Sequence, residues 1–340
     1  MQSNNNKQQQ DEDLDMSPED TENGNRRTAW IITGGKAGMN AQCIGVAEAL
    51  NTKYEFIKAA PTGPWKWFAP WVPVVPWHTA NYPDSPLNPP WPDIAIACGR
   101  ISQAYLKEIK RAVGSKTFTV YLQDPRHSCE YADLIWASEH DKMRGPKVIT
   151  TITSPHAHSF EKLQKLRGAA HELLDSMPYP RVMITLGGPN KVYRYKSASI
   201  NRLIRAIKDL CELGASFLIT PSRRTPKELS EAVEIVTRDR PRVLWDGEGE
   251  NPYAHFLAKA DYFLVTGDSV NMTGEACSTG RPVYTFMPDG GSAKFDRFHT
   301  SLQNYGATRL LPDRITTLDD WQYEPLDSAS VIADEIRKRW

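Results

Sequence analysis

Apolar and polar positions repeat one order along this chain: a short apolar run, a turn, and a stretch with helical spacing. An apolar, β-favouring run between turn residues predicts a buried strand, and the helical stretch predicts a crossover to a parallel strand. The pattern therefore predicts an α/β fold with parallel sheets. Strands are predicted at 29–33, 54–58, 93–97, 117–122, 133–137, 182–186, 216–220, 242–246, 262–266 and 282–286.

The order is most complete at 261–286. A strand is predicted over 262–266, a helix over 270–279 and a second strand over 282–286. A helix that begins at the carboxyl end of a parallel strand turns its free N–H groups and its positive dipole end toward a crevice. The amino end of this helix is therefore a predicted anion-binding site.

Polar side chains in this stretch fit two interpretations. Asp268 or Ser269 can cap the helix, and Glu275 lies one to two turns further on, within reach of a ribose held above phosphates. An ordinary strand–helix–strand unit, in which Asp268 and Ser269 serve only as caps, has the same pattern.

The strand pattern starts twice, each time with a strand, a glycine turn (34–40 and 187–191) and a helix. Glycine lets the backbone approach a ligand or a packing partner closely, but neither turn is a P-loop or a G-x-G-x-x-G motif. Prolines at 178 and 180 predict a boundary between two domains. The predicted parts are a disordered acidic tail (1–27), an N-terminal Rossmann-like domain (28–177), a C-terminal Rossmann-like domain (178–326) and a helix that packs back on the first domain (327–340).

Segment 61–92 is rich in proline and contains five tryptophans. So many prolines exclude a regular helix or a central strand. Two interpretations stay open: the segment is a long loop folded over its domain, or its indoles contact a membrane or a partner.

Composition narrows the class of protein. The formal net charge of the 340 residues is zero, so no basic footprint for nucleic acid is present. The apolar runs are too short to span a bilayer, and the N-terminus lacks a signal or transit pattern. The five cysteines contain no C-x-x-C pair, which indicates reduced thiols and a cytoplasmic location. Asp-x-Asp spacings occur only in the tail, so no metal site is predicted there, because a disordered segment cannot hold the geometry.

Polar groups follow three successive strands of the first half, at 98–102, 123–127 and 138–141. The carboxyl ends of parallel strands are where an open sheet places its ligands. His127, Glu139, His140 and Asp141 could be metal ligands, but their order lacks a zinc spacing, and an acid–base or acceptor-orienting role is favoured.

Two Rossmann-like halves and the stretch 261–286 resemble the two-domain glycosyltransferase architecture called GT-B. More closely, residues 29–310 resemble the "elongated mitochondria" fission family of plant fission factors and their bacterial relatives. The matching residues are 123–126, 139–141, 186–189, 220–226, 251–253, 265–272 and 275–276.

This resemblance implies a cleft between the domains and a nucleoside-diphosphate sugar as donor. By carry-over, Glu275 would bind the ribose, and Ser269 and Val270 would present N–H groups to the diphosphate. Gly188, Asn190 and Arg223 would surround the same phosphates, and Trp245 would lie beside the base. Departure of a nucleoside diphosphate needs charge stabilisation, which a helix terminus and arginines supply without metal.

One departure concerns the acceptor base. Lipid-acceptor transferases of this architecture often carry a His in the first glycine loop, where this chain has Met39 and Asn40. Asp124 and His140 are the candidate bases in its place.

Three hypotheses follow. The first is a metal-independent glycosyltransferase at the cytosolic face of a membrane, with 61–92 meeting a lipid acceptor. The second is a non-catalytic adaptor that recruits a partner, which for plant members is implied to be a dynamin-related GTPase at the outer mitochondrial surface. The third, epimerisation or reduction of a sugar nucleotide, lacks both a dinucleotide fingerprint and a Tyr-x-x-x-Lys pair.

Overall fold

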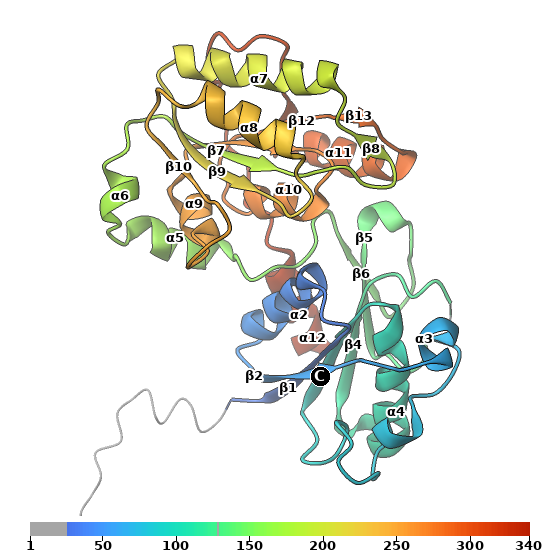
Figure 1. Cartoon of the computed structure of the whole chain (residues 1–340). Helices are drawn as coiled ribbons and strands as arrows, with labels where there is room; N and C mark the ends of the chain where they lie inside the picture. The colour runs from blue at the N-terminus through green and yellow to red at the C-terminus, as the bar shows by residue number, and fades with distance from the viewer. Residues whose placement is uncertain (1–25, 128) are drawn as a thin grey trace, which may run out of the picture.

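The computed structural model describes residues 26–127 and 129–340, so the predicted tail lies outside the described residues except for positions 26 and 27. Two six-stranded sheets occupy separate halves of the molecule (Figure 1). Every neighbouring pair of strands within them is parallel. The predicted fold class, an α/β protein with two Rossmann-like domains of parallel sheet, is confirmed.

The N-terminal sheet has the order β2-β1-β3-β4-β5-β6. Alternate residues of β1 enter apolar clusters on opposite faces: Trp30 and Ile32 on one, Ala29 and Ile31 on the other. The elements are β1 (Thr28–Thr33), α2 (Ala37–Ala49), β2 (Lys53–Lys58), α3 (Pro64–Phe68), η1 (Pro76–His78), β3 (Ile94–Cys98), η2 (Arg100–Ser102), α4 (Gln103–Val113), η3 (Gly114–Lys116), β4 (Phe118–Leu122), β5 (Leu134–Ser138), η4 (Glu139–Asp141) and β6 (Val148–Thr151).

The C-terminal sheet has the order β10-β9-β7-β11-β12-β14, and a small antiparallel pair, β8 and β13, lies beside it. The elements are α5 (Phe160–Gly168), α6 (Glu172–Asp175), β7 (Arg181–Leu186), β8 (Tyr193–Arg194), α7 (Ser197–Glu212), β9 (Ser216–Pro221), α8 (Lys227–Val236), β10 (Arg242–Leu244), α9 (Tyr253–Lys259), β11 (Tyr262–Thr266), α10 (Val270–Cys277), β12 (Val283–Phe286), β13 (Asp289–Gly290), α11 (Ala293–Tyr305), β14 (Thr308–Leu310) and α12 (Ser328–Arg339).

In each sheet the strand order reverses at one point. The reversal lies between β1 and β3 in the first sheet and between β7 and β11 in the second. A crevice opens outside the carboxyl ends of the strands at such a point, and ligands bind there. Both glycine turns follow strands at these reversals, β1 and β7, and the α10 turn follows β11.

Residues 160–177 pack with the C-terminal domain, whereas the prolines at 178 and 180 predicted the boundary after them. Leu163, Leu174 and Met177 are buried in one apolar cluster with Phe256 and Phe263. Two helices, α5 and α6, occupy this segment, because Ala169 takes an extended conformation after Gly168 and the His171 side chain caps α6. The chain therefore crosses between the domains near 152–159, ahead of the proline turn.

The last helix, α12, lies against α2 and β6 of the N-terminal domain (Figure 1). Ile332 and Ile336 are fully buried there with Cys43 and Val46. The hydroxyls of Ser328 and Thr153 are 2.7 Å apart, which joins the start of α12 to the first interdomain crossing. The C-terminal segment thus forms a second connection between the domains.

The proline-rich segment contains short helices that the sequence analysis did not predict. α3 begins at Pro64 and η1 at Pro76, at the one helical position where a missing N–H costs nothing. Three apolar residues of the segment are buried in the core: Val74, Val75 and Leu87. Two of its tryptophans face solvent, with Trp67 79% and Trp71 71% exposed.

Candidate functional site

The first glycine turn connects β1 to α2. Gly35 adopts φ +82°, and its N–H donates to the Thr33 hydroxyl at 3.1 Å, while that hydroxyl donates to Asn40 Oδ1 at 2.5 Å. Lys36 precedes the helix, and its side chain forms no cap. The turn thus leaves the ammonium group of Lys36 available to the space between the domains.

The second glycine turn is held by Asp268, a buried carboxylate directly after β11. Asp268 accepts the Gly188 N–H at 2.9 Å and the Tyr195 hydroxyl at 2.5 Å, and it forms an ion pair with Arg224 at 3.4 Å. A Cβ atom on Gly188 would lie 2.0 Å from the Arg224 carbonyl oxygen, so only glycine fits there. Asp268 therefore fixes the β7 turn against the β11 turn.

The amino end of α10 lies next to the amino end of α2. A Cβ atom on Gly38 would lie 3.0 Å from Asn271 Nδ2, which places the two helix starts in contact across the domain boundary. Ser269 caps α10, since its hydroxyl accepts the Met272 N–H at 3.4 Å. The positive ends of two helix dipoles thus lie at the same interdomain region.

Glu275 lies further along α10 and is hydrogen-bonded. The Tyr253 hydroxyl donates to Glu275 Oε2 at 2.6 Å, and the Tyr253 ring is 5.7 Å from the His158 ring. Burial raises the pKa of Glu275, and the hydrogen bond from Tyr253 lowers it again in part. The Tyr253 hydroxyl uses one acceptor position of this carboxylate and thereby orients it.

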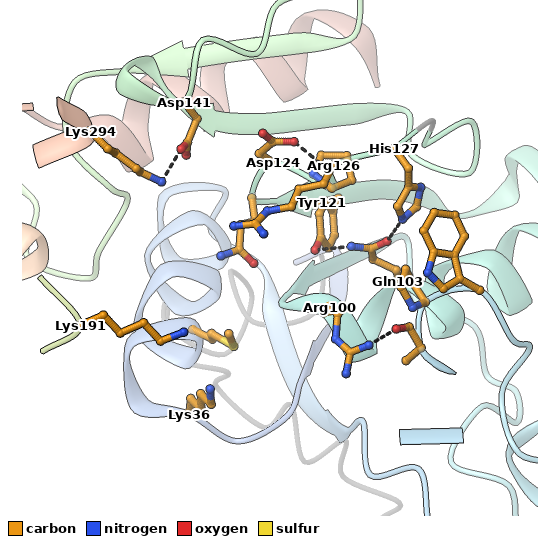
Figure 2. Close-up of a pocket in the computed structure, with 16 residues that line it drawn as sticks. Lys36, Arg100, Gln103, Tyr121, Asp124, Arg126, His127, Asp141, Lys191 and Lys294 are labelled. Atoms are coloured by element: carbon orange, nitrogen blue, oxygen red, sulfur yellow. Dashed lines mark hydrogen bonds and ion pairs between the residues drawn. The ribbon is translucent and has the colours of Figure 1, made fainter. Parts of the chain in front are cut away.

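A cavity of about 790 Å³ opens between the domains at the carboxyl ends of β1, β3 and β4 (Figure 2). Five cationic and two acidic side chains are part of its wall. Lys191 and Lys294 belong to the C-terminal domain, so both domains contribute. The ionic side chains are Lys36, Arg100, Arg126, Lys191 and Lys294, with Asp124 and Asp141.

Two of the five cations are committed to protein partners. Lys294 forms an ion pair with Asp141 across the domain boundary. Arg100 donates to the backbone carbonyls of Lys66, Trp67 and Ala69. A network of polar groups lines the same wall: Gln103 donates to the Tyr121 hydroxyl at 2.8 Å and lies 2.6 Å from His127 Nε2.

The two candidate bases lie in different surroundings. Asp124 lines the cavity and accepts the Arg126 N–H at 2.8 Å. His140 is buried between the domains against Phe298, with a ring separation of 5.5 Å, and it is not part of the cavity wall. Burial lowers the pKa of His140 to about 4. Asp124 is thus the candidate with access to a ligand.

The seven residues assigned to the nucleotide lie near α10 and the β7 turn, and none lines the cavity. Asn190 Nδ2 donates to the Asp268 carbonyl at 3.4 Å, and Trp245 Nε1 donates to the Glu248 carbonyl at 3.3 Å. Arg223 is exposed, while its neighbour Arg224 donates to the Gly188 carbonyl at 2.9 Å. Asp268 brings Gly188 and Arg224 together beside Ser269 and Val270.

Several cavity residues had only a weak signal in the sequence, or none. Arg126 and His127 follow β4 in the polar run that also contains Asp124, so their position was a signal. Lys191 ends the second glycine turn, but Lys294 lies in the first turn of α11, with no motif around it. Within residues 26–127 and 129–340, no group of three His, Cys, Asp or Glu side chains is arranged to hold a metal ion.

The facing parallel sheets and the cavity between them define a two-domain protein of the GT-B type. The chain belongs to the family described as Mitochondrial fission ELM1, whose model matches residues 37–340. No helix in the part of the chain that the structure describes is long and apolar enough to cross a membrane.

Two relatives and one solved structure illustrate the similarity. The "Mitochondrial fission protein ELM1" of Arabidopsis thaliana is 30% identical over 271 residues, which cover 73% of this chain but only 64% of that protein. The "Uncharacterized protein RP120" of Rickettsia prowazekii is 25% identical, with 91% of this chain and 97% of that protein covered. The UDP-GlcNAc 2-epimerase of Methanocaldococcus jannaschii has the same fold, with a TM-score of 0.53, 12% identity, and 92% of this chain and 99% of that chain covered.

The epimerase changes one inference from the sequence. The missing dinucleotide fingerprint argued against epimerisation, but an enzyme named as an epimerase has this fold. The fold therefore does not separate epimerisation from glycosyl transfer.

Proposed function

We propose that this protein binds a nucleoside-diphosphate sugar between its domains and transfers the sugar to an acceptor at a membrane surface. One observation carries the proposal: the strand order of each sheet reverses at one point, and the helix starts beside these two points are in contact. The starts of α2 and α10 are in contact through Gly38 and Asn271, beside a cavity with cations from both domains. The positive ends of the two helices can stabilise the charge that develops on a departing diphosphate.

The reaction breaks the bond between the anomeric carbon and a diphosphate oxygen, and the bonding electrons leave with the diphosphate. A hydroxyl oxygen of the acceptor forms the new bond to that carbon, and its proton passes to a base. Asp124 is proposed as this base because it lines the cavity, whereas the buried ring of His140 does not. Ser269 and Val270 would offer backbone N–H groups to the diphosphate, and Glu275 would accept from the ribose.

Uridine diphosphate is the first nucleotide to test, since the epimerase with this fold acts on a UDP sugar by its name. A ligand that binds only the folded chain stabilises it by about 2.7 kcal/mol at a hundred times its Kd. We expect 1 mM UDP, GDP or dTDP to raise the Tm in a thermal-shift assay, and Glu275→Gln to reduce that rise.

The control for Glu275→Gln is Glu228→Gln, the same change at an exposed position on α8. It should leave the shift unchanged. The proposal fails if no nucleotide raises the Tm of the unmodified chain. If the nucleotide raises the Tm of both variants as much as that of the unmodified chain, Glu275 does not contribute to the nucleotide site.

A second candidate function is an adaptor without catalysis, favoured by the apolar surface at α3. Trp67 is 79% and Phe68 is 59% exposed, and aromatic residues of this kind are enriched at interfaces. An adaptor would keep its cellular function in Glu275→Gln and lose it in Trp67→Ser with Phe68→Ser. An enzyme would lose function in Glu275→Gln. Deletion of 61–92 is unsuitable, because Val74, Val75 and Leu87 belong to the core.

A further inference from the structure

Three of the five cations in the cavity wall stand apart from the two that are committed to protein partners. Within the described part of the chain, the side chains of Lys36, Arg126 and Lys191 form no hydrogen bond or ion pair, while Lys294 neutralises Asp141. Among the described residues of the wall, Asp124 is then the single carboxylate without a cationic partner. The cavity therefore carries an excess of positive charge that suits an anion with more than one charge.

These three cations come from three different turns. Lys36 follows β1, Arg126 follows β4, and Lys191 follows β7 of the other domain, so an occupant would touch both domains (Figure 2). Arg126 is held at φ +63° by the hydrogen bond from its N–H to Asp124. The bond fixes the backbone of this turn at the cavity wall, and the forked donors of the Arg126 guanidinium suit a phosphate group.

An apolar surface begins at the wall of the same cavity. Trp71 lines the cavity, is 71% exposed, and lies 4.8 Å from the His127 ring. Arg100, another wall residue, binds the backbone of Lys66 and Trp67 and so fastens α3 to the cavity. We call Trp67, Phe68, Trp71 and Trp77 the aromatic rim; their exposed fractions are 79%, 59%, 71% and 44%.

We infer that the cavity and the aromatic rim together bind one amphiphile: a phosphate head group that occupies the cavity and a hydrocarbon tail that lies along the rim. Cations attract the head, and the exposed rings lose water when the tail covers them. A free sugar would use only one of the two surfaces. Where this amphiphile is the acceptor of the sugar, a phosphate oxygen takes the place of the hydroxyl and, being already deprotonated, needs no base; that role rests on the function proposed above, and the binding does not.

The test compares three soluble probes on the full chain by isothermal titration calorimetry: farnesyl phosphate, farnesol and inorganic phosphate. Farnesyl phosphate should bind at least tenfold more tightly than either of the others, because it alone meets both surfaces. Phosphatidylcholine vesicles with a long-chain prenyl phosphate should also retain the chain in a flotation assay, and vesicles with the prenyl alcohol should not. Equal affinity for farnesyl phosphate and inorganic phosphate, or for farnesyl phosphate and farnesol, would overturn the inference.

Matched variants separate the two surfaces. Arg126→Asn, which tolerates the left-handed backbone, and Lys191→Gln should each weaken farnesyl phosphate about tenfold and leave farnesol unchanged. Trp67→Ser should weaken both farnesyl phosphate and farnesol. Lys227→Gln and Ile235→Ser make the same kinds of change on exposed positions of α8 and should alter nothing.

Competition with UDP distinguishes this inference from the proposed function. If UDP displaces farnesyl phosphate, the cavity binds the diphosphate of the donor. The inference of a separate amphiphile site is then wrong, while the proposed function stands. If farnesyl phosphate binds as expected but no nucleotide raises the Tm, the inference stands and the transferase falls. Binding of both ligands at once supports both.

Discussion

Asp268 shows how one side chain joins the turns that follow β7 and β11. Its carboxylate is buried and accepts from the Gly188 N–H, the Tyr195 hydroxyl and Arg224. Removal of the carboxylate leaves buried donors without an acceptor, which costs about 1–3 kcal/mol for each group. The turn after β7 would then lose its attachment to the turn after β11.

We therefore predict that Asp268→Ala lowers the Tm by several degrees and also weakens any UDP-dependent shift. Thermal unfolding by differential scanning fluorimetry, with and without UDP, measures both effects. Asp313→Ala, the same change at an exposed position, should stay within about 0.5 kcal/mol of the unmodified chain. Equal Tm values for the two variants would show that Asp268 does not hold the turns together.

Site residues that directly follow a strand could be predicted from the sequence. Residues that come together only through tertiary packing could not. Asp124 was predicted from its place after a strand, and it lines the cavity. Arg223 and Arg224 are adjacent in sequence, and no local pattern indicates that Arg224 turns toward Asp268. Lys294 reaches the cavity from the other domain, so its role depends on domain packing that one sequence does not encode locally.

At the scale of elements, the packing of α2 and α10 against the first interdomain crossing depends on small residues. A Cβ atom on Gly45, inside α2, would lie 2.4 Å from the backbone carbon of His156, and one on Gly274 would lie 3.1 Å from Thr153 Cβ. Backbone atoms cannot rotate away as a side chain can. Glycine is therefore required at position 45, although it weakens a helix relative to alanine.

The prediction is that Gly45→Ala destabilises the protein even though the change favours helix formation by about 0.5–1 kcal/mol. The clash with His156 should cost about 1–3 kcal/mol and decide the sign. Gly168→Ala on α5 is the control, because nothing lies within 4 Å of its added methyl group, and it should be neutral or stabilising. Urea unfolding of both variants tests this; a Gly45→Ala chain as stable as the control variant would contradict it.

Strands that are buried along their whole length were the easiest elements to predict. β3, β4, β5 and β7 are buried along their whole length, and the sequence placed each within one residue of its observed ends. β6 and β14 were missed, because they are short and only partly buried. The boundary after residue 177 did not match the packing, since proline marks a turn but not the domain that buries the preceding helix.

At the scale of the whole molecule, the first crossing between the domains carries two histidines that fold in their neutral form. Burial lowers the pKa of His156 and of His158 to about 4, against 6.5 for an ordinary histidine. Glu275, Tyr253 and Lys162 are the ionisable groups beside them. Between pH 6.5 and pH 4 the unfolded chain binds more protons than the folded one at these histidines, so their contribution to stability is lost as the pH falls.

Glu275 acts in the opposite direction. Its pKa is raised by burial, so the folded chain holds a proton more tightly there, and its contribution to stability grows as the pH falls. Each histidine is expected to cost on the order of 2 kcal/mol between pH 7 and pH 5. We thus predict that the Tm falls over this range, that His156→Gln makes the fall smaller, and that Glu275→Gln makes it larger. The measurement is Tm against pH for the unmodified chain and the two variants. If the slopes do not separate in this order, the contact between the domains does not bury His156 in its neutral form and Glu275 with a raised pKa.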